Sequence, residues 1–139
     1  MSEGDFNETE KISLQLTCYS YDLCGNRIRE KRYLDFQTET SARGRVHLIY
    51  YVYDKCNRII CIKDSIGSEL HYAYDEKGRI KEERRKINDS SWQEVFYTYD
   101  NAGRMVEMIQ SADQYGCGKQ YVSTYCVYDE NGNAIKIIT

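Results

Sequence analysis

The side chains that could carry chemistry are few in this sequence, and they do not fall into a known catalytic spacing. It contains two histidines, His47 and His71. Neither belongs to a metal-binding spacing such as HxxxH, and no Ser/His/Asp or Cys/His signature accompanies them. An active site needs unlike residues that converge. We therefore expect both histidines to occupy strand faces, and we predict no catalytic residue, no metal site, no cofactor and no enzymatic activity.

Cysteines are the second group of reactive side chains, and their positions favour free thiols. They are Cys18, Cys24, Cys56, Cys61, Cys117 and Cys126, with no CxxC pair. Cys24 and Cys56 each follow a Tyr-Asp pair by two residues and should occupy equivalent turns. Equivalent turns of neighbouring hairpins lie roughly 9–10 Å apart, whereas a disulfide needs Cα atoms within about 7 Å. The spacing predicts free thiols in a reducing compartment.

Five aspartates form the third group, and each directly follows a tyrosine. They are Asp22, Asp54, Asp75, Asp100 and Asp129. A row of carboxylates could bind Ca²⁺, but such ligands lie about 2.4 Å from the ion, and neighbouring units are too far apart to share one. We expect each aspartate instead to open a type I turn and to bond to backbone N–H groups two or three residues further on.

These aspartates mark a repeat that must position every other side chain. The five Tyr-Asp pairs recur at intervals of 21–32 residues, which is typical of a repeat architecture. Three residues after the aspartate comes a glycine in four units, namely Gly25, Gly78, Gly103 and Gly132. A type I turn followed by a left-handed residue needs positive φ at that place. Asn57 stands there in the second unit, and asparagine is the next best residue for that conformation.

Tyrosines precede the turns in pairs that share one face of a strand. Tyrosine occurs 14 times. The paired residues are Tyr19/Tyr21, Tyr51/Tyr53, Tyr72/Tyr74 and Tyr97/Tyr99, while Tyr128 is preceded by Cys126. Residues i and i+2 of a strand point to the same side. The rings therefore form either a packed cross-strand ladder or a candidate binding face, and on a concave sheet such a face would suit the flat sides of sugars.

The pattern predicts an all-β fold: an antiparallel meander of about five stacked β-hairpins that forms a curved sheet, partly closed if it curls far enough. Strands are expected at 12–22, 26–36, 45–54, 58–64, 68–75, 79–87, 92–100, 104–111, 120–129 and 133–139. Residues 1–11 are predicted to be a disordered acidic lead-in, and 12–139 a single domain. The basic run at 77–86 is interleaved with glutamate, so we expect it to be a solvated strand face.

Bulk properties exclude several classes of partner. The formal net charge is −3, so there is no general attraction to nucleic acid or to anionic membranes. No apolar run approaches the length of about 20 residues that a membrane span needs. The start lacks the basic and apolar regions of a secretory signal. We expect a cytoplasmic location.

The units "YDEKGRI", "YDNAGRM" and "YDENGNAI" resemble the YD repeats of the Rhs family, which also occur in wall-associated proteins of Gram-positive bacteria and in animal teneurins. The resemblance runs from about Tyr19 to Ile138. It implies a β-ribbon that spirals into a hollow shell, which encloses a C-terminal toxin in bacterial members and contributes to adhesion in teneurins. Five units are too few to enclose a cargo, and the proline of the self-cleaving junction is missing. No toxin domain is expected after "AIKIIT".

Together these observations predict a non-catalytic interaction or scaffold module. The partner would be another protein or a second copy of the chain, in a homodimer for example, and the resemblance suggests an adaptor or neutralising role in a bacterial toxin system. One alternative is a carbohydrate-binding module that uses the tyrosine-rich face to bind a glycan. Another is a fragment of a larger Rhs-type shell that has no function of its own.

Overall fold

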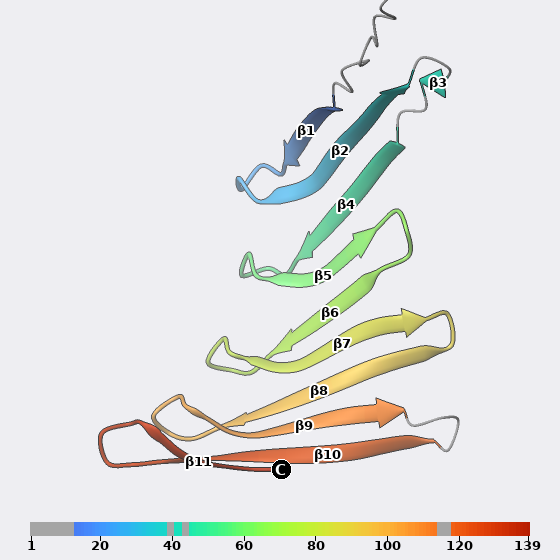
Figure 1. The fold of residues 1–139 in the computed structure, drawn as a ribbon. Coiled ribbons are helices and arrows are strands. Elements are labelled where there is room, and N and C mark those ends of the chain that lie inside the picture. The colour runs from blue at the N-terminus through green and yellow to red at the C-terminus, as the bar shows by residue number, and fades with distance from the viewer. Residues whose placement is uncertain (1–12, 39–40, 43–44, 114–117) are drawn as a thin grey trace, which may run out of the picture.

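A computed structural model describes residues 13–38, 41–42, 45–113 and 118–139, and within these ranges the protein is all-β (Figure 1). The predicted lead-in at 1–11 lies outside the described residues. The strands are β1 (Ser13–Tyr21), β2 (Arg27–Thr38), β3 (Ser41–Ala42), β4 (Arg45–Tyr53), β5 (Ile59–Asp64), β6 (Glu69–Tyr74), β7 (Ile80–Asn88), β8 (Ser91–Tyr99), β9 (Met105–Asp113), β10 (Lys119–Tyr128) and β11 (Ala134–Ile138). The ten predicted strands are confirmed, each within two residues at its ends.

The strands form one antiparallel meander, as the short turns between hydrophobic runs require. Their order is β1-β2-β4-β5-β6-β7-β8-β9-β10-β11. The two-residue strand β3 was not predicted: it lies between the strands predicted at 26–36 and 45–54, where Ser41 and Ala42 pair with the end of β2. The path begins at β1 and ends at β11, and no pairing joins these two strands in the described part of the chain. The sheet is therefore open: of the two outcomes that the sequence left, a curved open sheet and a partly closed one, the structure has the open sheet.

The sheet is a single layer, so its core is thin. Three residues are buried among those whose burial the structure describes: Cys61, Glu30 and Ser111, with 6%, 4% and 4% of their surface exposed. No large side chain there is fully buried. Domains usually bury a sheet face against a second layer. The strands of Figure 1 are stacked in chain order without such a layer.

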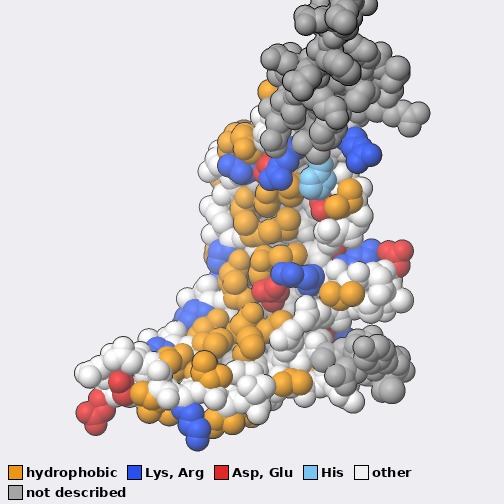
Figure 2. Space-filling model, viewed as in Figure 1, with side chains coloured by type: hydrophobic (Ala, Val, Ile, Leu, Met, Phe, Trp, Pro, Cys, Tyr) orange, Lys and Arg blue, Asp and Glu red, His pale blue; other side chains and the backbone are white. Residues whose placement is uncertain are grey.

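Strand pairing sorts the side chains onto two faces. Tyr51, Ile62 and Leu70 are direct neighbours across β4, β5 and β6, and they belong to what we call the tyrosine face. Cys61 and His71, one residue away in each strand, lie on the opposite face. On the face seen in Figure 2, hydrophobic side chains form a band that crosses the strands.

Each hairpin also contains a bulge that the sequence did not reveal. The register shifts by one residue at the tyrosine of every Tyr-Asp pair, for example between Ala73 and Tyr74, where Tyr74 pairs with Ile80. The same shift occurs at Tyr21, Tyr53, Tyr99 and Tyr128. Bulges increase the local twist and bend the strand, so a repeated bulge gives the sheet a repeated bend.

Candidate interaction surface and side-chain clusters

Each turn is closed by a carboxylate clamp, which the third hairpin shows clearly. Asp75 Oδ1 accepts hydrogen bonds from the backbone N–H groups of Lys77 and Arg79, both at 2.9 Å, and Asp75 Oδ2 accepts one from Arg79 Nε at 2.7 Å. Gly78 N donates to Asp75 O at 3.0 Å. The predicted capping role is confirmed, although the aspartate binds the N–H groups two and four residues further on, where two or three residues were predicted. Asp54 and Asp100 bind Arg58 and Arg104 in the same way.

The left-handed turn position is also confirmed. Gly25, Gly78, Gly103 and Gly132 have φ of 84°, 82°, 83° and 82°, and Asn57 has φ of 60°. The first and last units place asparagine where the others have arginine. Asn26 Nδ2 donates to Asp22 Oδ2 at 3.0 Å, and Asn133 Nδ2 donates to Asp129 Oδ2 at 3.3 Å.

Hydrogen bonds in the clamp lower the pKa of all five turn aspartates. At Asp54, Asp75, Asp100 and Asp129 the largest cause is the bond from the backbone N–H four residues on, and burial works against it. At Asp22 the largest cause is the side-chain bond from Asn26. Hydrogen bonds to the charged form favour that form. These carboxylates are therefore held ionised by their own turns.

A second set of contacts joins each hairpin to the next, and sequence reasoning missed it. The Arg79 guanidinium lies 4.5 Å from the centre of the Tyr99 ring in the following unit, and Tyr99 OH donates to Ile80 O at 2.6 Å. We call this combination of stacked arginine and donating tyrosine the inter-hairpin staple. It recurs with Arg58 over Tyr74 and with Arg104 over Tyr128, at 4.5 and 4.8 Å, and both hydroxyls donate to main-chain oxygens of the preceding unit at 2.6 Å.

The first pair of hairpins uses a variant of the staple. Asn26 Nδ2 donates to Asn57 Oδ1 at 2.9 Å, which links two turns 31 residues apart. Tyr53 OH donates to Arg27 O at 2.7 Å. Asn57 therefore does more than tolerate positive φ, because its side chain also receives the bond from Asn26. The signal for all staples was present in the sequence as the Arg or Asn that follows each Gly or Asn.

The predicted tyrosine-rich binding face divides into three groups. Tyr53, Tyr74, Tyr99 and Tyr128 are half-buried and donate their hydroxyls to the sheet itself. Tyr51, Tyr72 and Tyr97 are half-buried on the tyrosine face, and burial raises the pKa of each. Tyr19 and Tyr21 are exposed. The structure thus assigns the second tyrosine of each later pair to packing, and a ligand for the remaining rings stays a prediction.

One buried carboxylate lies on the tyrosine face near the start of the sheet. Glu30 accepts a hydrogen bond from Arg32 Nε, and Tyr51 OH donates to its second oxygen at 3.3 Å. Arg27 Nη1 lies 3.7 Å from that oxygen. The bond from Arg32 is the largest cause that lowers the pKa of Glu30, against the effect of burial. The buried charge is paired, as buried charges generally are.

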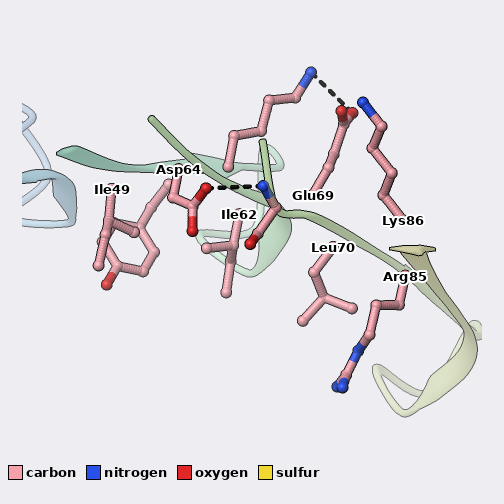
Figure 3. Close-up of a pocket in the computed structure, with 10 residues that line it drawn as sticks. Ile49, Ile62, Asp64, Glu69, Leu70, Arg85 and Lys86 are labelled. Carbon is pink, nitrogen blue, oxygen red and sulfur yellow. Dashed lines mark hydrogen bonds and ion pairs between the residues drawn. The ribbon is translucent and has the colours of Figure 1, made fainter. Parts of the chain in front are cut away.

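The margin of the sheet at the β5–β6 turn contains a shallow hollow of about 390 Å³ (Figure 3). Ile62, Leu70 and Arg85 point to one side of the strands there. Glu69 and Lys86 point to the other. The hollow combines an apolar floor with charged neighbours of both signs, and such a rim favours contact with another polypeptide over a purely apolar ligand.

The two histidines have different surroundings. His47 is half-buried on the tyrosine face, and its Nε2 lies 3.4 Å from Asp64 Oδ2 in a geometry that makes no hydrogen bond. His71 lies on the opposite face, 2.6 Å from Glu69 Oε1 and 3.9 Å from Cys61 Sγ, both measured from Nε2. The expected strand-face positions are confirmed. The convergence with Cys61 was missed, because it depends on the β5–β6 register, which pairs Cys61 with His71.

Cysteines in the described ranges are free. Cys18, Cys24 and Cys56 are exposed, Cys61 is buried and Cys126 is half-buried. The predicted free thiols are confirmed for these five, and Cys117 lies outside the described residues.

No helix in the described part of the chain is long and apolar enough to cross a membrane.

Comparison with solved structures shows that the fold is similar to a small part of much longer chains. The crystal structure of TcdB2-TccC3-Cdc42 matches with a TM-score of 0.57 and 16% identity, over 90% of this chain and 8% of that chain. TcdB2-TccC3 without its hypervariable C-terminal region gives the same values. The Tc holotoxin pore of Photorhabdus luminescens, with a mutation in TccC3, matches with a TM-score of 0.49 and 13% identity over 91% of this chain and 8% of that chain. Neither a known protein family nor a curated protein matches the sequence.

Proposed function

We propose that this chain is a non-catalytic scaffold module whose open sheet binds protein, with a second copy of the chain as its first partner. The observation that carries the proposal is the single-layer sheet with an unpaired apolar edge. Both sheet faces and the two end strands are available for contact in the described residues. A surface of this kind is unusual for an isolated soluble domain.

The outer edge of β11 supports pairing with another strand. Ile135, Ile137 and Ile138 are 62%, 67% and 43% exposed, and Lys136 is the one charged residue of this strand. Proteins usually protect sheet edges with charges, prolines or a covering segment. An unprotected edge forms backbone hydrogen bonds with a second strand, and the flanking isoleucines would be covered at the same time.

The hairpins themselves support a scaffold role. The same turn clamp is repeated five times, and staples fasten each hairpin to its neighbour. Repeats place like residues at like positions, which suits an extended surface. The proposed location is the cytoplasm, because the five free thiols are compatible with a reducing compartment.

A toxin system is the proposed setting. The fold is similar to part of two TcdB2-TccC3 structures, and TccC3 is also named in the Tc holotoxin. The YD-like repeats point the same way, since related repeats belong to bacterial toxin shells. In that setting an open sheet would serve as an adaptor or as a neutralising partner that pairs with a toxin-associated sheet.

Light scattering after size-exclusion chromatography tests the proposal. We expect the mass of the wild type to exceed that of a monomer and to increase with protein concentration. Ile137→Lys adds a charge at the β11 edge and should return the mass to the monomer. Ile66→Lys, at a 79% exposed isoleucine in the β5–β6 turn, is the matched control and should assemble like the wild type. A wild type that stays monomeric at every concentration, or an assembly insensitive to Ile137→Lys, would overturn pairing through this edge.

A further inference from the structure

We propose that Cys61, Glu69 and His71 form a binding site for a divalent transition metal, with Zn²⁺ as the best match. The three side chains lie on the opposite face of the sheet, where β5 and β6 pair. Their ligand atoms, one from each residue, all lie within 4.8 Å of one another. Thiolate sulfur, imidazole nitrogen and carboxylate oxygen are the three donor types that Zn²⁺ takes from proteins.

The backbone fixes this arrangement without help from a loop. Cys61 and His71 are direct cross-strand partners, and Glu69 lies two residues before His71 on the same face. Cys61 is 6% exposed, and neighbouring strands hold its main chain on both sides. Ligands carried by strands are positioned more rigidly than ligands carried by loops.

The distances are close to what a tetrahedral ion requires. With ordinary Zn–S, Zn–N and Zn–O bond lengths, sulfur and nitrogen would lie about 3.6 Å apart, and nitrogen and oxygen about 3.4 Å apart. The observed separations are 3.9 Å from Cys61 Sγ to His71 Nε2 and 2.6 Å from His71 Nε2 to Glu69 Oε1. To admit the ion, the nitrogen–oxygen separation must widen by about 0.8 Å and the sulfur–nitrogen separation must shorten by about 0.3 Å. Three protein ligands leave a fourth position for water or a partner group.

The same geometry argues against a catalytic thiol. A Cys-His-Glu relay needs the thiol at one ring nitrogen and the carboxylate at the other. Here both Cys61 Sγ and Glu69 Oε1 approach Nε2 of His71. Convergence on one nitrogen cannot pass a proton along the three groups, but it places three ligand atoms around a common point.

Two cationic residues are cross-strand partners of the proposed ligands: Lys63 pairs with Glu69, and Arg84 pairs with His71. Lys63 Nζ lies 2.9 Å from Glu69 Oε1, so it competes with a metal for that oxygen. Arg84 is the cross-strand partner of His71, but its side chain contacts other residues. The Arg84 guanidinium lies 5.3 Å from the centre of the Trp92 ring, and Arg84 Nε lies 3.3 Å from Glu94 Oε1. Trp92 lies against His71 with ring centres 5.6 Å apart. Among the residues that the structure describes, Lys63 is therefore the cation in direct contact with a proposed ligand.

Cobalt spectroscopy on the purified, reduced protein tests the site directly. We expect Co²⁺ to give a thiolate-to-cobalt charge-transfer band and visible d–d bands at one equivalent, and Zn²⁺ to displace it. Cys61→Ser should abolish the charge-transfer band, and His71→Ala should weaken binding by at least about tenfold, because losing even an outer-sphere partner of a metal ligand costs 10–100-fold. Cys56→Ser and Cys126→Ser are controls and should retain the band.

A gain-of-affinity variant keeps the test independent of folding defects. Lys63→Gln removes the competitor of the metal and should tighten Zn²⁺ binding by roughly two- to fivefold, which is what release of a partly exposed ion pair is worth. Glu69→Gln should weaken it. Zn²⁺ should raise the thermal midpoint of the wild type and leave that of Cys61→Ser unchanged. Absence of a charge-transfer band in the wild type, or its persistence in Cys61→Ser, would overturn the proposal.

Discussion

The guanidinium of Arg79 lies 4.5 Å from the centre of the Tyr99 ring. This contact joins the turn of one hairpin to the end of β8, which is the first strand of the next hairpin. Arg79 is itself held by the Asp75 clamp. A chain of contacts therefore runs from aspartate to arginine to tyrosine, and then through the Tyr99 hydroxyl to the main chain at Ile80. The residues of the repeat therefore stabilise each hairpin and also connect it to the next hairpin.

The arginine–tyrosine stack should be measurable as a coupling energy. In a double-mutant cycle with Arg79→Gln and Tyr99→Leu, we expect a coupling of about 0.5–1 kcal/mol, as for cation–π pairs at partly exposed sites. Urea unfolding of the four proteins provides the measurement. Strictly additive effects would show that the stacked geometry contributes nothing to the free energy of unfolding.

The tyrosine hydroxyl should contribute separately from the ring. Tyr99→Phe keeps the stack but removes the 2.6 Å bond to Ile80 O, so the free energy of unfolding should fall by about 0.5–1.5 kcal/mol. Tyr121→Phe is the control, because Tyr121 is 54% exposed and should change stability little. Equal losses in both variants would contradict the staple.

Replacement of the turn glycines by alanine should lower stability because of their positive φ, and not because the added Cβ would be crowded. Gly25→Ala meets no atom within 4 Å, whereas Gly78→Ala would place its Cβ 3.5 Å from Arg58 Nη1, an ordinary contact. Both positions have φ above 80°, which costs an L-residue about 1–2 kcal/mol. We expect similar losses in thermal unfolding experiments. A much larger loss at Gly78 would mean that the neighbouring arginine decides the outcome.

The turn aspartates should make the fold sensitive to acid. Their pKa values are lowered in the folded protein from the ordinary value of 3.8. A group with a depressed pKa contributes stability above its unfolded pKa and loses it as the pH falls through the folded value. The thermal midpoint should therefore fall as the pH drops below about 4. Asp75→Asn should flatten that decline, and Asp89→Asn, at a fully exposed side chain, should not.

Thiol reactivity should separate the cysteines. Cys18, Cys24 and Cys56 are exposed, and they should react quickly with iodoacetamide in the native protein. Cys61 should react much more slowly, because it is buried and because burial raises the pKa of its thiol. Mass spectrometry of peptides after timed labelling gives the rates. Fast labelling of Cys61 would show that β5 opens readily.

The sequence by itself determined the hairpins. The aspartate, the glycine or asparagine three residues later and the alternating tyrosines are local signals, since each acts within one turn or one strand. That is why ten strands, the left-handed positions and the capping aspartates could all be predicted. It is also why Asn57 could be recognised as an equivalent of glycine.

Only the tertiary structure decided what the repeated residues do between hairpins. The contacts of Arg79 with Tyr99, of Asn26 with Asn57 and of Cys61 with His71 depend on strand register. The strands of neighbouring hairpins meet in one continuous register between β2 and β4 and between β5 and β6, and no local sequence signal fixes that alignment. A shift of one residue moves every side chain to the other face, so these pairs exist only because the strands meet in this alignment.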